Sequence, residues 1–170
     1  MSDYTPARAA ASDALALLKA DHDTIKRLLR AVGALGDSHG DHDADTRLAA
    51  LIDDICYALT IHAMLEEEIL YPALRAAGHD DELLDEAEGE HASMRELVKR
   101  LEVLYPGEAH FAATVAVLAE EFGHHIDKEE SELFLAARRA GLDLAALGAR
   151  VAARRRALDA DLTAPAEARN

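Results

Sequence analysis

Apolar residues recur at three- and four-residue steps through most of the chain, which is the pattern of helices that bury one face. A polar stretch at 36–43, Gly78 and the Pro106-Gly107 pair interrupt this pattern. It predicts four long helices, at about 12–32, 45–77, 80–104 and 108–140, and a fifth at about 142–162. Short connections make successive helices antiparallel neighbours. The predicted fold is therefore all-α, an up-down-up-down four-helix bundle with an appended C-terminal helix, forming one domain over residues 12–162.

The same helix pair is used twice. Residues 62–71 and 125–134 both read His-x-x-x-Glu-Glu-x-x-Leu-aromatic. Residues 21–29 and 90–98 both read acid-His-x-x-aliphatic-basic-x-Leu-aliphatic. Each pair thus has a lone histidine on its first helix and a His-x-x-x-Glu segment on its second. With only two copies, the repeat indicates a bundle with pseudo-twofold symmetry and not a solenoid.

Histidine and glutamate occupy the apolar stripes of the four main helices. Residues four apart on a helix lie on one face, so each His-x-x-x-Glu segment presents an imidazole and a carboxylate in the same direction. A single buried histidine is usually a hydrogen-bonded core residue. Four of them, joined by two glutamates, are costly to bury unless cations compensate. The predicted metal ligands are His22, His62, Glu66, His91, His125 and Glu129.

The remaining polar and aromatic candidates receive other roles. Tyr57 is the tyrosine we would test as a further ligand, whereas Tyr71 is expected in the core and Cys56 is expected to pack. No side chain outside the ligands stands out as a catalytic acid or base. Two groups are expected to be solvated or, for the acids, to pair with arginines: His39, His42, His79, His110 and His124, and Glu67, Glu68, Glu130 and Glu132.

This four-part pattern of histidines and glutamates resembles the haemerythrin HHE cation-binding family, over roughly residues 12–140. The resemblance implies two non-haem iron ions joined by an oxo or hydroxo bridge, with iron preferred to manganese or zinc. It also implies that the two histidines of each half serve mainly one iron, and that both glutamates bridge.

The chain departs from the oxygen-carrying haemerythrins at two places. Their third helix carries His-x-x-x-His, but Ala87 and Arg95 stand four residues from His91. They use an aspartate five residues after the fourth-helix histidine, where this chain has Glu130. The resemblance therefore implies a His4Glu2 centre with open positions that reacts with a small oxidant or diatomic ligand: O2, NO or peroxide. Whether the protein is an enzyme stays open. The alternative is an iron or oxygen sensor, or a metal-stabilised binding module without turnover.

Charge and composition narrow the partners and the compartment. The formal charge of −15 disfavours nucleic acid, whose binding relies on Lys and Arg. No apolar run approaches the roughly 20 residues of a membrane span, the N-terminus lacks a secretory signal, and a single cysteine fits a reducing compartment. We therefore expect a cytoplasmic protein without a membrane partner. Four arginines give the C-terminal helix a basic character that suits an acidic face of the chain, a homodimer or an anionic partner: Arg150, Arg154, Arg155 and Arg156.

Overall fold

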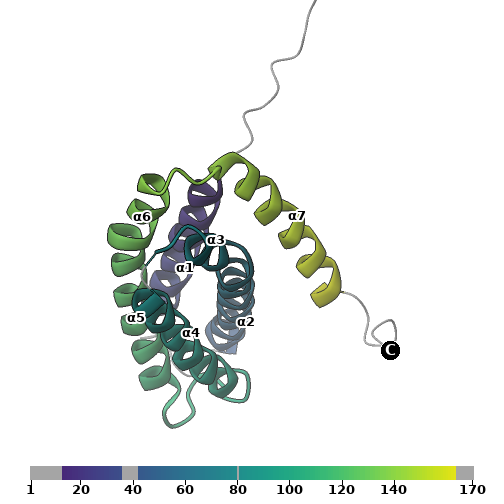
Figure 1. The fold of residues 1–170 in the computed structure, drawn as a ribbon. Coiled ribbons are helices and arrows are strands. Elements are labelled where there is room, and N and C mark those ends of the chain that lie inside the picture. The colour runs from purple at the N-terminus through teal and green to yellow at the C-terminus, as the bar shows by residue number, and fades with distance from the viewer. Residues whose placement is uncertain (1–12, 36–41, 80, 164–170) are drawn as a thin grey trace, which may run out of the picture.

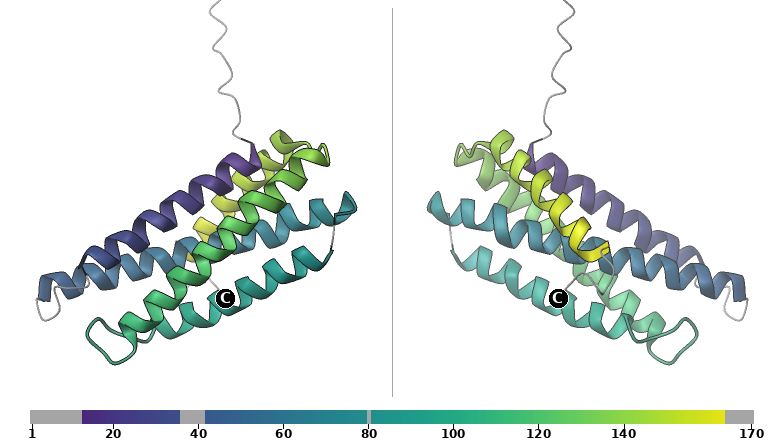
Figure 2. Two further views of the ribbon diagram at one scale, coloured as in Figure 1. Left: turned by 90° about the vertical axis from the view of Figure 1, so that its left-hand side faces the viewer. Right: turned by 90° about the vertical axis from the view of Figure 1, so that its right-hand side faces the viewer.

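The computed structural model describes residues 13–35, 42–79 and 81–163, and these form a bundle of long helical rods (Figure 1). The first and third rods are single helices, α1 (Ala14–Leu35) and α4 (Asp81–Leu101). The second and fourth rods are each built from three consecutive segments: α2 (His42–Leu65), η1 (Glu66–Leu70) and α3 (Tyr71–Ala76), then α5 (Phe111–Lys128), η2 (Glu129–Leu133) and α6 (Phe134–Arg139). The appended helix is α7 (Leu144–Thr163). The side views in Figure 2 show the four rods lying side by side along one long direction, as predicted for a four-helix bundle.

The helix ends follow local chemistry that is readable in the sequence. The Asp13 carboxylate accepts the backbone N–H of Ala16 at 2.8 Å and so caps α1. Gly78 and Gly141, which are equivalent in the repeat, end the second and fourth rods with φ of 77° and 67°, a conformation that favours glycine. Four expected boundaries were wrong by three residues. α2 begins at His42 instead of about 45, α4 ends at Leu101 instead of about 104, and the other two concern α1 and the fourth rod. α1 continues through Gly33 to Leu35, and the fourth rod begins at Phe111 because residues before it form turns. The sequence allows the first helix to start at Ser12 or Asp13; Ser12 lies outside the described residues.

The second and fourth rods each contain one π-helical turn, and in both cases the turn begins at a predicted bridging glutamate. The Tyr71 N–H donates to the carbonyl of Glu66, and the Phe134 N–H donates to that of Glu129, five residues back. Pro72, which has no N–H, stands where the first π turn gives way to α3. The second turn forms without a proline, so proline is not required. Such turns widen the helix locally and are common at functional sites.

The hydrophobic core is divided by a polar layer. One apolar cluster includes Leu15, Leu70 and Leu84, and a second includes Ile25, Ile55 and Leu118. Between them lie six buried polar side chains, each at most 2% exposed: His22, His62, Glu66, His91, His125 and Glu129. The two clusters enclose these side chains on both sides along the bundle axis, so the layer is shielded from solvent.

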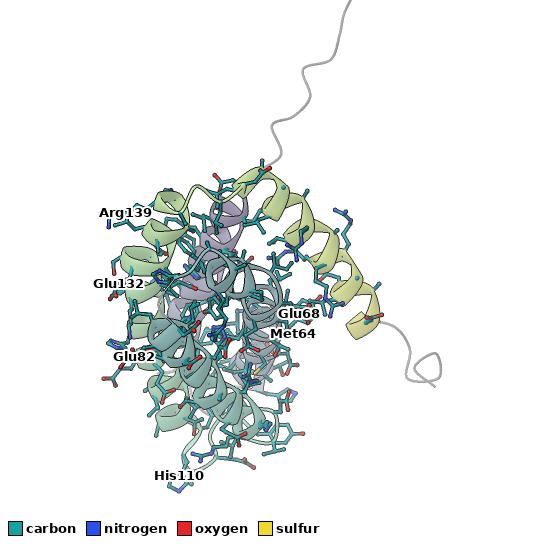
Figure 3. The ribbon with its side chains drawn as sticks, in the orientation of Figure 1. Met64, Glu68, Glu82, His110, Glu132 and Arg139 are labelled. Atoms are coloured by element: carbon teal, nitrogen blue, oxygen red, sulfur yellow. The ribbon has the colours of Figure 1, made fainter. Side chains whose placement is uncertain are left out.

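α7 lies across the face formed by α1 and α2 (Figure 2, right). Leu147, Val151 and Leu158 bury its apolar side within the first cluster. Its arginines reach acidic residues of the bundle: Arg154 Nε lies 2.6 Å from Glu68 Oε2, and Arg155 Nη2 contacts Asp21 Oδ2. Figure 3 shows Glu68 on the side that faces α7. The basic helix therefore covers an acidic face of its own chain.

The second rod, His42–Ala76, is long and apolar enough to cross a membrane by length and composition alone. Half of its most apolar window is buried inside the bundle, and the rod carries two of the six polar side chains in the central layer. A core helix of a bundle passes the same test.

Candidate metal centre

Each rod of the bundle contributes one histidine to the polar layer, and the ring nitrogens Nε2 meet in two pairs. The Nε2 atoms of His22 and His62 are 3.2 Å apart. Those of His91 and His125 are also 3.2 Å apart. Each pair comes from one half of the repeat, so the pseudo-twofold relation in the sequence is also present in the geometry.

Glu66 lies between the two pairs and turns one oxygen to each. Its Oε1 is 3.1 Å from His62 Nε2, and its Oε2 is 3.3 Å from His91 Nε2. Glu129 approaches both pairs through a single oxygen, Oε2, which is 3.2 Å from His22 Nε2 and 3.7 Å from His125 Nε2. Glu66 therefore faces the two histidine pairs through separate oxygens, and Glu129 faces both through one, so both carboxylates could serve as cation ligands.

The outward ring nitrogens, Nδ1, face a second set of carboxylates. His22 Nδ1 lies 2.9 Å from Glu130, and His91 Nδ1 lies 2.8 Å from Glu67. His125 Nδ1 lies 2.7 Å from Glu90. A carboxylate at Nδ1 holds the proton there and leaves the Nε2 lone pair free for a metal. The arrangement thus orients three imidazoles for coordination through Nε2.

The fourth histidine is held more loosely. His62 Nδ1 is 3.5 Å from Asp21 Oδ2, beyond a good hydrogen bond. The same Asp21 oxygen is engaged by Arg155 of α7. In the second half of the repeat, the equivalent acid Glu90 contacts its histidine directly. Asp21 is one methylene shorter than Glu90, and its oxygen also pairs with α7, which has no counterpart in the second half.

Aromatic rings support the lone histidine of each half. Tyr71 stacks on His91 at a centroid distance of 5.7 Å, and Phe134 stacks on His22 at 5.6 Å. The Tyr71 hydroxyl is also hydrogen-bonded to Glu66 Oε2 at 3.2 Å. Tyr71 therefore reaches the centre, and it is the tyrosine that the sequence placed only in the core.

The candidacy of Tyr57 was wrong. Its side chain is 39% exposed, and its hydroxyl donates to Asp159 of α7 at 2.5 Å. It lies on the outer side of α2, because positions 57 and 62 are five residues apart in ordinary α-helix and face different directions.

The field inside the layer shifts the proton affinity of the buried groups. Burial opposes a charged imidazole, but the carboxylates of Glu129 and Glu66 outweigh it and raise the pKa of His22 to about 10. Burial likewise opposes charge on His125, but Glu66 and Glu90 raise its pKa to about 10. Burial and the charge of Glu66 raise the pKa of Glu129. The layer therefore binds protons at the positions where cations would compete with them.

The donor set fits a pair of cations. Donor atoms about 2.1 Å from one cation lie roughly 3.0–3.4 Å from each other, close to the observed separations. His22, His62, Glu66 and Glu129 can surround one cation, and Glu66, His91 and His125 can surround a second. Glu66 Oε1 and Glu129 Oε2 are also buried without a hydrogen-bond partner, which is costly unless a cation occupies the cluster. A mixture of imidazole and carboxylate suits iron, manganese or zinc.

The pattern of histidines and glutamates agrees with a known family. The sequence model of the haemerythrin HHE cation binding domain matches residues 13–137. The chain belongs to this family. Among solved structures, this haemerythrin-like chain is similar to a haemerythrin HHE cation binding domain-containing protein from Mycobacterium kansasii. The TM-score is 0.70 at 25% identity, covering 86% of this chain and 87% of that one.

A curated protein from Nostoc sp., named DNA nickase, also resembles part of the haemerythrin-like chain. The two are 37% identical over 83 residues. The match covers 47% of this chain but 22% of the nickase, so it spans less than a quarter of that protein.

Sequence reasoning missed the outer carboxylates of this haemerythrin-like site. Glu67 and Glu130 were expected at the surface or on arginines. Glu67 does pair with Arg95 at 2.7 Å, and Glu130 pairs with Lys19 at 3.0 Å, but each also holds a central histidine. The sequence did hold one signal for these acids: each directly precedes or follows a predicted metal-ligating residue.

Cys56 and the other described histidines are not among the six clustered side chains. His42, His110 and His124 are exposed, while His79 is half-buried; His39 lies outside the described residues. Cys56 is buried in the second apolar cluster, and burial raises the pKa of its thiol to about 11. Its packing role agrees with the expectation, because a thiol with a raised pKa is a poor nucleophile.

Proposed function

We propose that this protein binds two iron ions in the six-residue cluster and reacts with a small oxidant or diatomic ligand, namely O2, NO or peroxide. The observation that carries the proposal is the common orientation of the imidazoles. All four direct Nε2 inward, and carboxylates face Nδ1 on the outside. A core histidine that served packing alone would not need this outer set of acids.

Each protein group has a distinct part in the proposal. The histidines of one half hold one iron, those of the other half hold the second, and Glu66 and Glu129 join them. The outer acids fix the ring tautomers, and the two apolar clusters exclude bulk water. Bound iron supplies redox chemistry and coordination of small molecules.

The absence of a further ligand on α4 favours reaction over a saturated structural site. Arg95, one helical turn beyond His91, pairs with Glu67 and offers no lone pair. Sites with two imidazoles and a carboxylate that leave positions open are typical of non-haem iron that reacts with oxygen.

Metal analysis together with an optical spectrum tests the proposal. Natively purified protein should contain about two irons per chain, and the oxidised form should absorb in the near ultraviolet. Azide should change that spectrum, because an open position accepts it. Added peroxide would distinguish turnover, which releases O2, from binding. Stoichiometric zinc without any redox-dependent colour would contradict the proposal.

An iron or oxygen sensor is the second candidate, and one contact favours it. Arg155 of α7 binds Asp21, and Asp21 faces the Nδ1 atom of His62. Occupancy of the His22–His62 pair is thereby linked to the attachment of α7. If the protein is a sensor, removal of iron should release α7, which limited proteolysis and amide exchange would detect. Unchanged protection of α7 would count against this candidate.

The resemblance to the Nostoc nickase does not lead us to propose DNA cleavage. A formal charge of −15 repels phosphate, and the six clustered side chains lie at most 2% exposed. A duplex cannot reach a layer buried to this extent.

A further inference from the structure

A small cavity of about 20 Å³ lies between α2 and α4, beside the candidate metal centre. His62, from one ligand group, and His91, from the other, form part of its wall. The rest is mainly apolar, with contributions from Leu59, Ala63, Met94 and Val98. One water molecule needs about 10–15 Å³ measured in this way, so the cavity has room for a diatomic molecule.

The repeat predicts an equivalent cavity between α5 and α1, where two wall positions carry bulkier side chains and a third, Gly123 in place of Thr60, carries none. Phe122 stands in place of Leu59, and Ile126 stands in place of Ala63. Both are at most 1% exposed. The Phe122 ring meets the His22 ring edge-on at a centroid distance of 6.2 Å. The exchange of alanine for isoleucine and leucine for phenylalanine fills the approach to His22.

We propose that an uncharged diatomic molecule, O2 or NO, reaches the centre through the α2–α4 cavity and that Phe122 and Ile126 close the equivalent approach between α1 and α5. This inference rests on the proposed function for the metal centre that the molecule would meet. It adds a side of approach to the centre and narrows the ligand to an uncharged diatomic molecule. A second cavity, beside His125 and Glu129, holds about 10 Å³, the space of at most one water molecule.

The polar groups at the cavity favour an apolar occupant. The Thr60 hydroxyl donates to the carbonyl of Cys56 at 2.8 Å, so its hydrogen is already engaged. The Arg95 guanidinium donates one of its five N–H groups to Glu67 at 2.7 Å, and apolar residues make up most of the remaining wall. Peroxide would need hydrogen-bond partners on entering, whereas O2 and NO would lose little on leaving water.

The position of Ala63 gives the inference a sharp test. Ala63 lies one residue from His62 in sequence, is 7% exposed, and its side chain ends at the methyl group, so leucine at this position would extend into the cavity. Ala44, on the same helix and 6% exposed, belongs to no part of the cavity wall. Ala63→Leu and Ala44→Leu are therefore matched substitutions, one within the cavity and one remote from it.

Krypton first tests the cavity without reference to iron chemistry. Crystals of the full chain as purified, pressurised with krypton, should show an atom between Ala63 and Met94 and none beside Phe122. Krypton is close in size to O2 and is located by its anomalous scattering. Absence of krypton from the α2–α4 cavity of the unsubstituted protein would overturn the proposal, whether or not the variants fold.

Ligand kinetics then test the route. The iron(II) protein and both variants, matched for iron content, are mixed with NO and followed optically. Ala63→Leu should slow binding by at least about tenfold, while Ala44→Leu should stay within about twofold of the parent. Equal rates for Ala63→Leu and Ala44→Leu would overturn the route and leave the proposed function standing. Krypton in the cavity of a protein whose iron binds no NO would instead overturn the proposed function and support the cavity.

Discussion

The Tyr71 hydroxyl lies 3.1 Å from Glu129 Oε1, so a side chain of the first half of the repeat holds a carboxylate of the second. The same hydroxyl is hydrogen-bonded to Glu66. Phe134, the equivalent residue of the second half, has no hydroxyl. Only the first half therefore donates a hydroxyl to a carboxylate of the other half, and the environments of Glu66 and Glu129 differ.

Tyr71→Phe tests this link. The substitution keeps the ring that stacks on His91 but removes the donor from two buried carboxylates. We expect a loss of about 1–3 kcal/mol in the free energy of unfolding and a shifted optical spectrum at unchanged iron content. Tyr57→Phe is the matched control, because Tyr57 bonds to Asp159 at the surface. A shifted spectrum for Tyr57→Phe and none for Tyr71→Phe would reverse the assignment.

Glu66→Gln tests the bridge. The amide retains the shape of the side chain but loses the charge that both histidine pairs face, so iron content should fall to about one ion per chain or less. Metal analysis of protein purified in parallel measures the effect. Glu68→Gln, which breaks the surface pair with Arg154, should leave the iron content intact. Full loading of the Glu66 variant would refute its bridging position.

The pH dependence of the metal-free protein follows from the raised pKa values of His22 and His125. Protonated imidazole stabilises the fold fully below pH 6.5, the ordinary histidine value, and this contribution is lost as the pH rises through about 10. Urea unfolding should therefore show stability falling by a few kcal/mol, roughly 2–5, between pH 6.5 and 10.

Two controls accompany the pH measurement. His42→Ala, at an exposed position on the first turn of α2, should reproduce the parent profile. Protein loaded with metal should lose the dependence, because coordination requires neutral imidazole and releases the protons in advance. Stability that stays level or rises with pH in the metal-free protein would contradict the imidazolium contribution.

The contact between α7 and the centre predicts a further difference. Arg155→Ala frees the Asp21 oxygen, and the carboxylate should then close on His62 Nδ1 from 3.5 Å to hydrogen-bonding distance. A stronger outer partner makes the imidazole a better ligand, so iron should leave more slowly to a chelator. Asp21→Asn should act oppositely and weaken metal affinity about 10–100-fold. Asp23→Asn, at a surface site two residues away, should change neither measurement.

The six clustered side chains could be predicted because the four-residue helical step and the internal duplication pointed to the same residues. The four-residue step in each His-x-x-x-Glu segment fixes a common face, and the duplication shows which histidine to choose. His125 rather than the exposed His124 follows from that step alone. The bundle itself follows from the apolar stripes and the short connections, which leave few alternatives for packing.

The outer acids could not be predicted from one helix at a time. Adjacent residues point about 100° apart on a helix, so an acid cannot serve the ligand beside it in sequence. Glu67 serves His91 on α4, and Glu130 serves His22 on α1. Assigning them requires the order of the helices around the bundle, which is a property of the fold.

Tyr71 escaped prediction for a local reason. In a regular α-helix, a residue five positions after Glu66 points about 140° away from it. The π turn of η1 adds one residue to that turn and brings Tyr71 back over the glutamate. Pro72 is a sequence signal for an irregular turn in the second rod. Its counterpart in the fourth rod is Leu135, which is no such signal, yet both rods contain a π turn.

Each outer carboxylate faces a histidine on the next helix around the bundle, and all four do so in the same rotational sense. Asp21 of α1 faces His62 of α2, Glu67 of η1 holds His91 of α4, Glu90 of α4 holds His125 of α5, and Glu130 of η2 holds His22 of α1. Two of these four steps cross from one half to the other, so neither half could orient its own lone histidine. Two identical copies of 81–139, docked about a twofold axis, would nevertheless supply every step of this circuit. A homodimer of a single helical hairpin could therefore complete the circuit, whereas the Tyr71 hydroxyl, present in one half only, is a feature that two identical copies could not supply.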